Sequence, residues 1–235
     1  MSKNNRWKQA QNYEKTWWDK RVSEIDFGFY KTFADELVRF SEEEFKISDE
    51  TKILEIGSGA GGIITYLTQS KHRYAIDPLE SFYFSQQSFL NQRDGEVIYS
   101  EEKGESLSFS DDQFDIVIMD NVLDHCENPN LVISEVKRVL KNGGYIYFKQ
   151  NTYNYWGKFV RNIMELFVID KGHPFTFTKN NLKKLIKGND FTIIKHSRSG
   201  YLKTWKKEVT SPGAKNKTKA MLFVTRDKVT CLLKK

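Results

Sequence analysis

The chain has 235 residues, of which 39% are hydrophobic and 14% aromatic, and these values exclude a wholly disordered chain. The formal net charge is +6, and two cysteines, Cys126 and Cys231, are too few for a disulfide framework, which favours a reducing, cytoplasmic location. No apolar run approaches the roughly 20 residues of a membrane-spanning helix, and the N-terminal stretch lacks the apolar core of a signal peptide. We therefore expect one α/β domain over residues 1–235, with no membrane span.

Two helices are predicted before residue 48, because apolar side chains recur at helical spacing from Trp7 to Trp17 and from Phe29 to Phe40. From Lys52 onward, short apolar runs alternate with helical patterns, which is typical of right-handed βαβ units on a parallel sheet. The predicted strands are 52–56, 73–76, 96–100, 114–120 and 145–150, and the predicted helices are 63–69, 80–92 and 130–141, the last ended by Asn142, Gly143 and Gly144.

Residues 151–177 interrupt this alternation as an aromatic-rich insertion, after which Thr178 is predicted to cap a helix that ends near Gly188. The segments 191–196 and 220–226 are predicted as two neighbouring strands, which makes the final strand antiparallel. We expect the segment between them to be a solvated loop, with a patch for nucleic acid, anionic lipid or a phosphorylated substrate as the alternative. Its lysines are Lys203, Lys206, Lys207, Lys215, Lys217 and Lys219.

A glycine-rich loop, LEIGSGAGG, joins the first predicted strand to the first predicted helix. Gly57, Gly59 and Gly62 satisfy the G-x-G-x-x-G pattern of dinucleotide-binding proteins, and Asp77 ends the next strand where a ribose-binding acid belongs. The loop therefore indicates a nucleoside cofactor, with a nicotinamide-dependent dehydrogenase as one alternative. Glu55 favours an adenosyl cofactor, because nicotinamide-binding folds usually keep an apolar residue at that position.

The block ESLSFSDDQFDIVIMDNVLDHCENPNLVISEVKRVLKNGGYIYF (105–148) and the segment HPFTFTKNNLKKLIKGNDF (173–191) complete the pattern. Over residues 52–191 the chain resembles the class I S-adenosylmethionine-dependent methyltransferases, in particular the branch of ubiquinone- and menaquinone-biosynthesis methyltransferases. The resemblance implies a Rossmann-like α/β fold with a seven-stranded, mostly parallel sheet, an antiparallel last strand and helices on both faces. Residues 1–48 are then expected to form an N-terminal helical lid, and residues 151–177 an insertion over the active site.

The resemblance also implies a site for S-adenosylmethionine. By matched position, Asp77 would bind the ribose hydroxyls, and Lys103 departs from the family pattern because an acid often stands there. The four strand ends concerned lie at one edge of a parallel sheet, so they should converge on one crevice. The expected cofactor residues are Glu55, Gly57, Ser58, Gly59 and Gly61 around the methionine part, Asp77 and Pro78 at the ribose and adenine, Gly104, Glu105 and Ser106 along the adenine edge, and Asp120 and Asn121 against the methionine.

His125 and His173 are the candidate general bases, each with a purely structural role as the alternative. Cys126 is expected to be a packed side chain, and no metal site is expected, because four histidines and two cysteines supply few ligands. Methyl transfer depends on alignment and on exclusion of water, so aromatic residues of the two covering segments are candidates for the acceptor pocket, with ordinary packing as the alternative. These are Tyr13, Trp17, Trp18, Tyr153, Tyr155 and Trp156.

The function that the sequence favours is methyl transfer to an oxygen or nitrogen of a small-molecule or glycan-type acceptor, by a monomer or a homodimer. An RNA or protein methyltransferase is the first alternative, suggested by the late lysines. However, the Asn/Asp-Pro-Pro-Tyr/Phe motif of enzymes that methylate nucleic-acid amines is absent after residue 119. A dehydrogenase and a relative that binds the cofactor without catalysis are further alternatives.

Overall fold

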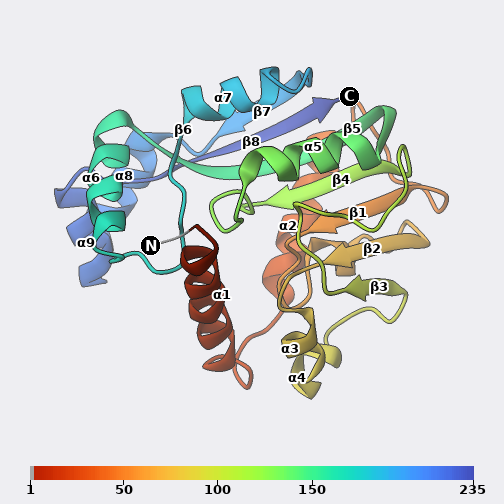
Figure 1. Ribbon diagram of the computed structural model, residues 1–235, viewed down its shortest axis with the longest axis horizontal. Helices are drawn as coiled ribbons and strands as arrows, with labels where there is room; N and C mark the ends of the chain where they lie inside the picture. The colour runs from red at the N-terminus through yellow and green to blue at the C-terminus, as the bar shows by residue number, and fades with distance from the viewer. Residues whose placement is uncertain (1–2) are drawn as a thin grey trace.

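The computed structural model describes residues 3–235 and has a single mixed sheet of order β3-β2-β1-β4-β5-β8-β7 (Figure 1). Strands β1 to β5 run parallel, and β8 is antiparallel to both β5 and β7, so the predicted fold class is confirmed. A two-residue strand that the sequence did not predict, β6, adds to one end of β5. The bounds are β1 Lys52–Ile56, β2 His72–Ile76, β3 Val97–Ser100, β4 Phe114–Asp120, β5 Leu140–Tyr153, β6 Phe177–Thr178, β7 Thr192–Arg198 and β8 Asp227–Lys234.

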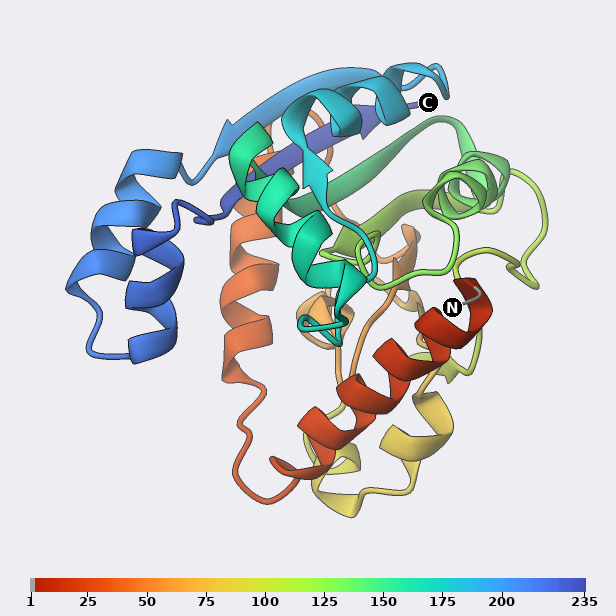
Figure 2. The same cartoon turned by 60° about the vertical axis from the view of Figure 1, so that its left-hand side comes forward.

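Helices cover both faces of the sheet, as the alternation of side chains along β4 illustrates. Val117 and Met119 pack in a core with α5 and α7, whereas Ile116 and Ile118 pack in a second core with α2. The helix α1 lies instead beyond the carboxyl ends of the parallel strands (Figures 1 and 2). The helices are α1 Lys3–Asp19, α2 Gly28–Ser41, α3 Glu80–Phe84, α4 Gln87–Leu90, α5 Pro129–Val139, α6 Tyr155–Leu166, α7 Lys179–Lys187, α8 Tyr201–Thr210 and α9 Ala214–Met221, with a 3₁₀ turn η1 at Ile63–Tyr66.

Two predicted helices are shorter than the sequence suggested. The helix expected at 63–69 is only the four-residue turn η1, and the one expected at 80–92 is divided into α3 and α4 by an extended residue, Gln86. The helix α5 ends at Val139 rather than at Asn142–Gly144, because Leu140 already pairs with Phe114 of β4. By contrast, the Thr178 cap of α7 is confirmed, since its hydroxyl accepts from the Asn181 N–H at 3.2 Å.

The prediction for residues 199–226 is wrong in two ways. The lysine-rich segment is not a loop but a pair of helices, α8 and α9, and the last strand is β8 rather than residues 220–226. The pair is held by Trp205, whose ring stacks on Phe223 at 6.3 Å and whose Nε1–H donates to the carbonyl oxygen of Ala220 at 3.0 Å. Within residues 3–235, no helix has the length and apolarity to cross a membrane.

Candidate active site

A cavity of about 320 Å³ opens where the strand order reverses, at the carboxyl ends of β1, β2 and β4. The helices α1 and α2 close it from outside the sheet. Of the twelve residues predicted to bind the cofactor, ten line this cavity: Glu55, Gly57, Ser58, Gly59, Asp77, Pro78, Gly104, Glu105, Asp120 and Asn121. The structure thus brings the four predicted strand ends together in one crevice.

Gly61 and Ser106 are the two predicted residues that do not line the cavity. A Cβ atom at Gly61 would lie 2.5 Å from the ring of Phe27, so this glycine allows close packing of the segment before α2. Ser106 pairs with Lys103 in an isolated bridge beside the cavity. Both contribute to the shape of the loops and not to the cavity wall.

The glycine loop is closed by Glu55, which is buried at the end of β1. Its Oε1 accepts from the N–H of Ile63 at 3.0 Å and its Oε2 accepts from the N–H of Ile64 at 2.8 Å. These donors face the Glu55 carboxyl rather than the cavity, and the helix that follows is only the short turn η1. Burial, aided by the charges of Asp120 and Asp77, raises the pKa of Glu55 to about 8.

Asp77 lies at the end of β2 and fixes the loop from the other side. Its Oδ2 accepts from the N–H of Gly59, and its Oδ1 accepts from the N–H of Leu79, each at 2.9 Å. Gly57 and Gly59 have positive φ angles of 70° and 61°, which other residues rarely adopt, so the glycines permit this tight path. Burial raises the pKa of Asp77 to about 6.

Apart from His125, the described acidic and basic residues that line the cavity all carry carboxyl groups. Among the described residues, six carboxyl side chains line the cavity and no lysine or arginine does. The six are Glu14, Glu55, Asp77, Glu102, Glu105 and Asp120. Such a wall favours a ligand with cationic groups and disfavours the pyrophosphate of a nicotinamide dinucleotide, which is usually neutralised by donors or cations.

On the expected adenine side, the carboxyl of Glu105 is already engaged. Its Oε1 accepts from the N–H groups of Glu127 at 2.6 Å and Asn128 at 3.0 Å, so it anchors the loop before α5. Lys103, the departure from the family pattern, lies over the ring of Trp7 at 3.8 Å and closes the rim. Glu102, which the sequence analysis did not select, is the acid that lines the cavity here.

The loop after β4 is positioned by a buried amide on the neighbouring strand. Gln150 of β5 donates from Nε2 to Asp124 Oδ1 at 2.8 Å and to Asn121 Oδ1 at 3.2 Å, and its Oε1 accepts from the N–H of Leu123 at 3.2 Å. Lys149 Nζ lies 3.3 Å from Asp120 Oδ2, which balances one carboxylate of the wall. Sequence reasoning missed both residues, because they belong to a strand predicted only as core.

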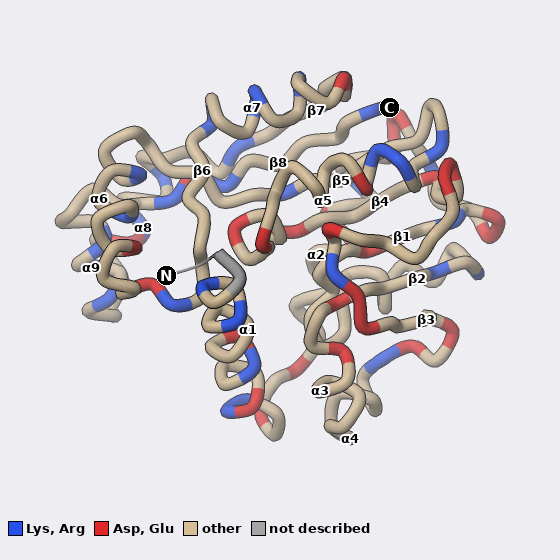
Figure 3. Tube along the Cα trace, viewed as in Figure 1, with Lys and Arg blue, Asp and Glu red and all other residues tan. Residues whose placement is uncertain are grey.

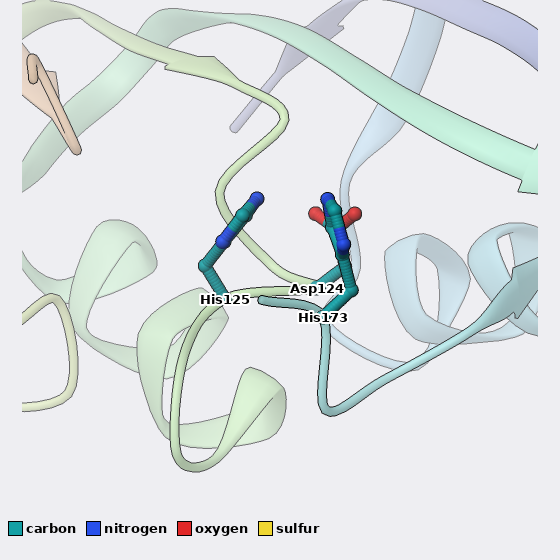
Figure 4. Close-up of side chains that lie close together, drawn as sticks. All are labelled: Asp124, His125 and His173. Carbon is teal, nitrogen blue, oxygen red and sulfur yellow. The ribbon is translucent and has the colours of Figure 1, made fainter. Parts of the chain in front are cut away.

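The two candidate bases lie side by side although 48 positions of sequence separate them. The ring centroids of His125 and His173 are 4.5 Å apart, and Figure 4 shows both next to Asp124. His125 also lines the cavity, and among the described residues its imidazole makes no hydrogen bond. His173 Nδ1 lies 2.8 Å from Asp170 Oδ1. Burial alone would lower the pKa of His173, but Asp170 and Asp124 outweigh it and raise that pKa.

Asp124, His125 and His173 also form a group that could hold a metal ion. One ligand atom from each lies within 4.8 Å of the others, and two imidazoles with a carboxylate are donors that suit Zn²⁺, Mn²⁺ or Fe²⁺. No metal site was expected because four histidines and two cysteines supply few ligands, but the fold brings His173 from the insertion to Asp124 and His125. One feature opposes a metal here, because the Asp124 carboxyl is already engaged by the Gln150 amide.

Cys126 is buried beside the cavity and is not poised as a nucleophile. Its Sγ lies 3.2 Å from the carbonyl oxygen of Leu123, and burial, aided by the charges of Glu105 and Asp124, raises the pKa of the thiol. The free thiol therefore dominates at neutral pH, which agrees with the predicted packing role.

The N-terminal helix covers the cavity with a different set of side chains from the one expected. Trp18 lines the cavity, but Tyr13 and Trp17 are exposed on the outer side of α1. The lining positions are Trp7, Gln11, Glu14 and Trp18, which recur at helical spacing. The apolar pattern of the sequence did not predict this face, because two of its four side chains, Gln11 and Glu14, are polar.

The aromatic residues of the insertion do not reach the cavity. Tyr155 and Trp156 are exposed, and Trp156 Nε1–H donates to the carbonyl oxygen of Leu222 at 3.0 Å. Tyr153 is partly buried under Arg161, whose guanidinium lies 4.6 Å from its ring centroid. What the insertion does bring to the site is the loop 167–176, with Asp170 and His173.

Arg6 joins the two covering segments. Its guanidinium pairs with the carboxylate of Glu165 at the end of α6, and it donates to the carbonyl oxygens of Lys171 at 2.8 Å and Asp170 at 2.7 Å. The side chain is buried, so these charge-assisted bonds are shielded from water. No sequence motif marks this contact, because its partners lie about 160 positions away.

Comparison with known proteins supports the fold class and the assignment of the part that contains the glycine loop to a methyltransferase domain. A family model described as a methyltransferase domain matches residues 54–148. The chain is 33% identical over 104 residues to a highly reducing polyketide synthase of Penicillium polonicum, which covers 40% of this chain and 4% of that protein. It is 29% identical over 145 residues to a glycine/sarcosine/dimethylglycine N-methyltransferase of Actinopolyspora halophila. This alignment covers 54% of this chain and 24% of that protein.

These aligned segments span less than half of the curated relatives' own length. Among solved structures, geranyl diphosphate C-methyltransferase of Streptomyces coelicolor, in complex with Mg²⁺, geranyl diphosphate and S-adenosylhomocysteine, superposes with a TM-score of 0.66 at 13% identity. That match covers 92% of this chain and 82% of the other, and it shows a shared fold. Residues 54–148 therefore match a methyltransferase domain, and the fold is shared with solved class I S-adenosylmethionine-dependent methyltransferases.

Proposed function

We propose that the protein transfers the methyl group of S-adenosylmethionine to an oxygen or nitrogen of a small-molecule acceptor, glycan-type molecules included. The observation that carries this proposal is the cavity wall at the reversal of strand order, which holds six carboxyl groups and no lysine or arginine among the described residues. S-adenosylmethionine carries a sulfonium and an ammonium group, so this wall suits its charge. The methyltransferase-domain match over residues 54–148 supports the same cofactor.

Within the cavity, the parts of the cofactor are assigned by the chemistry of the wall. The Asp77 carboxylate would accept hydrogen bonds from the ribose hydroxyls, at the strand end where such an acid binds ribose. Asp120 and Asn121, next to the glycine loop, would face the methionine part. The methyl group would then point toward His125, which lies on the same wall and is the side chain shared by the cavity and the histidine pair.

The reaction needs alignment more than it needs side-chain chemistry. When bound, S-adenosylmethionine would supply the methyl group to a lone pair of the acceptor, with S-adenosylhomocysteine as the neutral leaving group, and the cavity wall would hold the two partners in line. The acceptor loses one proton, and His125 would take it, because its imidazole has no competing hydrogen bond within residues 3–235. His173, held by Asp170, would stand beside the acceptor and stabilise charge there.

A calorimetric titration of the full chain tests the cofactor assignment. We expect S-adenosylhomocysteine to bind with one site per chain and a nicotinamide dinucleotide to give no heat. Turnover would then be measured as release of S-adenosylhomocysteine with panels of hydroxylated and aminated small molecules. Binding of the dinucleotide alone would overturn the proposal. Binding of S-adenosylhomocysteine without turnover of any methyl acceptor, carbon acceptors included, would favour a non-catalytic relative.

A further inference from the structure

The helix α6 presents an apolar stripe to the outside of the molecule. Trp156, Phe159, Ile163 and Leu166 recur at helical spacing, and each is between 42% and 79% exposed. The stripe continues into the following loop with Phe167 and Ile169, which are also exposed. A helix of a water-soluble domain normally turns such a stripe inward. The exposure of this one therefore suggests that another molecule covers it.

The helix pair α8–α9 extends the same apolar surface. Trp156 of α6 donates to the carbonyl oxygen of Leu222 at 3.0 Å, so the two regions are in contact. Figure 1 shows α6, α8 and α9 on the same side of the molecule, and in Figure 2 the α8–α9 pair projects from the body while α6 stands nearer its middle. We call this region the end surface; its exposed apolar residues are Trp156, Phe159, Ile163, Leu166, Phe167, Ile169, Leu202, Met221, Leu222 and Phe223.

The charge beside the end surface is positive and unbalanced. The six lysines of α8 and α9 make no ion pair with any described residue, and Figure 3 shows basic positions gathered along these helices. The one acid of the pair, Glu208, is buried and accepts from the Thr225 hydroxyl at 2.6 Å. Burial lowers the pKa of Lys219, and the nearby charges of Arg226 and Lys215 add to that effect, which indicates crowding of like charges.

We propose that the end surface binds the surface of an anionic lipid bilayer, with the apolar stripe of α6 in the interface and the lysines of α8 and α9 on the head groups. An amphipathic helix with exposed Trp, Phe and Leu next to basic residues has the composition of an interfacial membrane anchor. Since no described helix is long and apolar enough to span the bilayer, the contact is peripheral.

Two other occupants fit the surface less well. Single-stranded nucleic acid would use the lysines and the aromatic rings, but it gives no role to exposed aliphatic side chains such as Leu166, Ile169 and Met221. A second copy of the chain would cover the apolar residues, but a two-fold interface would bring the unpaired lysines of both copies toward one another. The bilayer accounts for both the apolar and the basic residues.

The end surface is joined to the candidate site by covalent and polar links. The helix α6 leads directly into the loop 167–176 that carries His173, and Arg161 of α6 pairs with Asp170 at 2.7 Å. Docking would therefore place the acceptor side of the cavity close to the bilayer, which suits an amphipathic acceptor drawn from lipid. Only this last step rests on the proposed function; binding to lipid does not.

Sedimentation of the full chain with vesicles tests the proposal. Vesicles of equal parts phosphatidylglycerol and phosphatidylcholine should bind the protein, pure phosphatidylcholine should bind it at least about tenfold less, and 0.5 M salt should reduce the binding to anionic vesicles. The apolar variant carries Phe159→Ser, Ile163→Ser and Leu166→Ser, and the basic variant carries Lys203→Glu, Lys206→Glu and Lys207→Glu. Each should lower the partition coefficient by about tenfold or more.

The matched control carries Lys46→Glu, Lys183→Glu and Lys187→Glu, which change the net charge equally at exposed positions outside the end surface. It should keep most of the vesicle binding. S-adenosylhomocysteine affinity, measured in parallel, verifies the fold of each variant and separates failure of this inference from failure of the proposed function. Equal loss in the control, no binding to anionic vesicles, a dimer that the apolar variant dissociates, or tighter binding of a single-stranded RNA oligonucleotide would each overturn the proposal.

Discussion

Two regions of the molecule are held together by different kinds of contact. One is the half formed by residues 52–148, and the other consists of the segments that cover it. In the first half, local patterns determine the structure: strand ends, glycines with positive φ and buried carboxyls such as Glu55 and Asp77 satisfy one another within short distances. The covering segments, α1 and residues 151–177, are held by long-range polar contacts and expose apolar side chains. Ten of the twelve predicted cofactor positions line the cavity and lie in the first half, and the covering segments add one face of α1 to the cavity and the loop that carries His173.

The strongest test of this division is the residue at its boundary, His125. His125→Ala should lower the turnover number by about 10² to 10⁴, the usual range for a lost general base, with no change in S-adenosylhomocysteine affinity. His196→Ala, on the exposed side of β7, is the matched control and should leave both quantities unchanged. Full activity of His125→Ala would assign His125 to shaping the pocket.

Within the first half, Asp77→Ala should weaken S-adenosylhomocysteine binding by about 100-fold, because two hydrogen bonds to a charged acceptor are lost. The loss should be similar for adenosine, which shares the ribose. Because Asp77 also holds the N–H groups of Gly59 and Leu79, thermal unfolding must accompany the titration. Unchanged affinity for adenosine in a folded variant would refute the ribose assignment.

For the covering segments, Arg6→Ala removes the buried contact between α1 and the loop 167–176. Loss of bonds from a charged donor, about 1.5–3 kcal/mol each, should speed hydrogen exchange in α1 and weaken cofactor binding by about tenfold. Arg39→Ala, at an exposed position of α2, is the control. If exchange is unaltered in α1, Arg6 does not hold the lid.

The pH dependence of cofactor affinity tests the contribution of residues 52–148, because Asp77 in this half ionises near pH 6. Asp77 accepts hydrogen bonds as a carboxylate and has a pKa of about 6, so its own contribution to affinity should be constant above that value, whereas Glu55 ionises only near pH 8. Below it the carboxylate takes up a proton and affinity should fall, by about tenfold at pH 5. Calorimetry from pH 5 to 8 measures this, and an Asp77→Asn variant should show no such fall. A fall that persists in that variant would point to another acid of the wall.

The smallest effect is expected from chelation. Dialysis against a chelator should leave turnover unchanged, because the hydrogen bond from Gln150 engages the Asp124 carboxyl that a metal at the histidine pair would need. Metal analysis of the purified protein is the direct measurement. Loss of turnover that Mn²⁺ or Zn²⁺ restores would show that Asp124, His125 and His173 hold a metal.

The contrast also explains which parts of the molecule could be predicted. Parallel strands have sharp apolar limits, so β1 and β4 were predicted to the residue, and ten of the twelve predicted cofactor positions, which lie at or after the ends of β1 to β4, line the cavity. The shortened η1 was missed because the Glu55 carboxyl, a tertiary partner, takes the first helical N–H groups. The helices α8 and α9 were missed because a lysine-rich sequence gives no clear periodic apolar signal.

Residues of the candidate site were likewise predictable only where a local sequence pattern places them. Residues on strand ends were predictable, whereas Gln150, Arg6 and the lining face of α1 depend on partners that no local pattern reveals. The meeting of His125 and His173 was also beyond the sequence, although both had been selected singly. Whether the branch of quinone-biosynthesis methyltransferases is the right one within the family stays a prediction.

The buried contacts of Arg6 have a consequence for the order of events during turnover. They connect the helix that closes the cofactor cavity to the backbone of the residue that orients His173. We therefore expect that movement of α1 to release a spent cofactor would also disturb the loop that carries His173. We expect an ordered cycle in which the cofactor enters first, the methylated product leaves before S-adenosylhomocysteine, and the last release sets the pace.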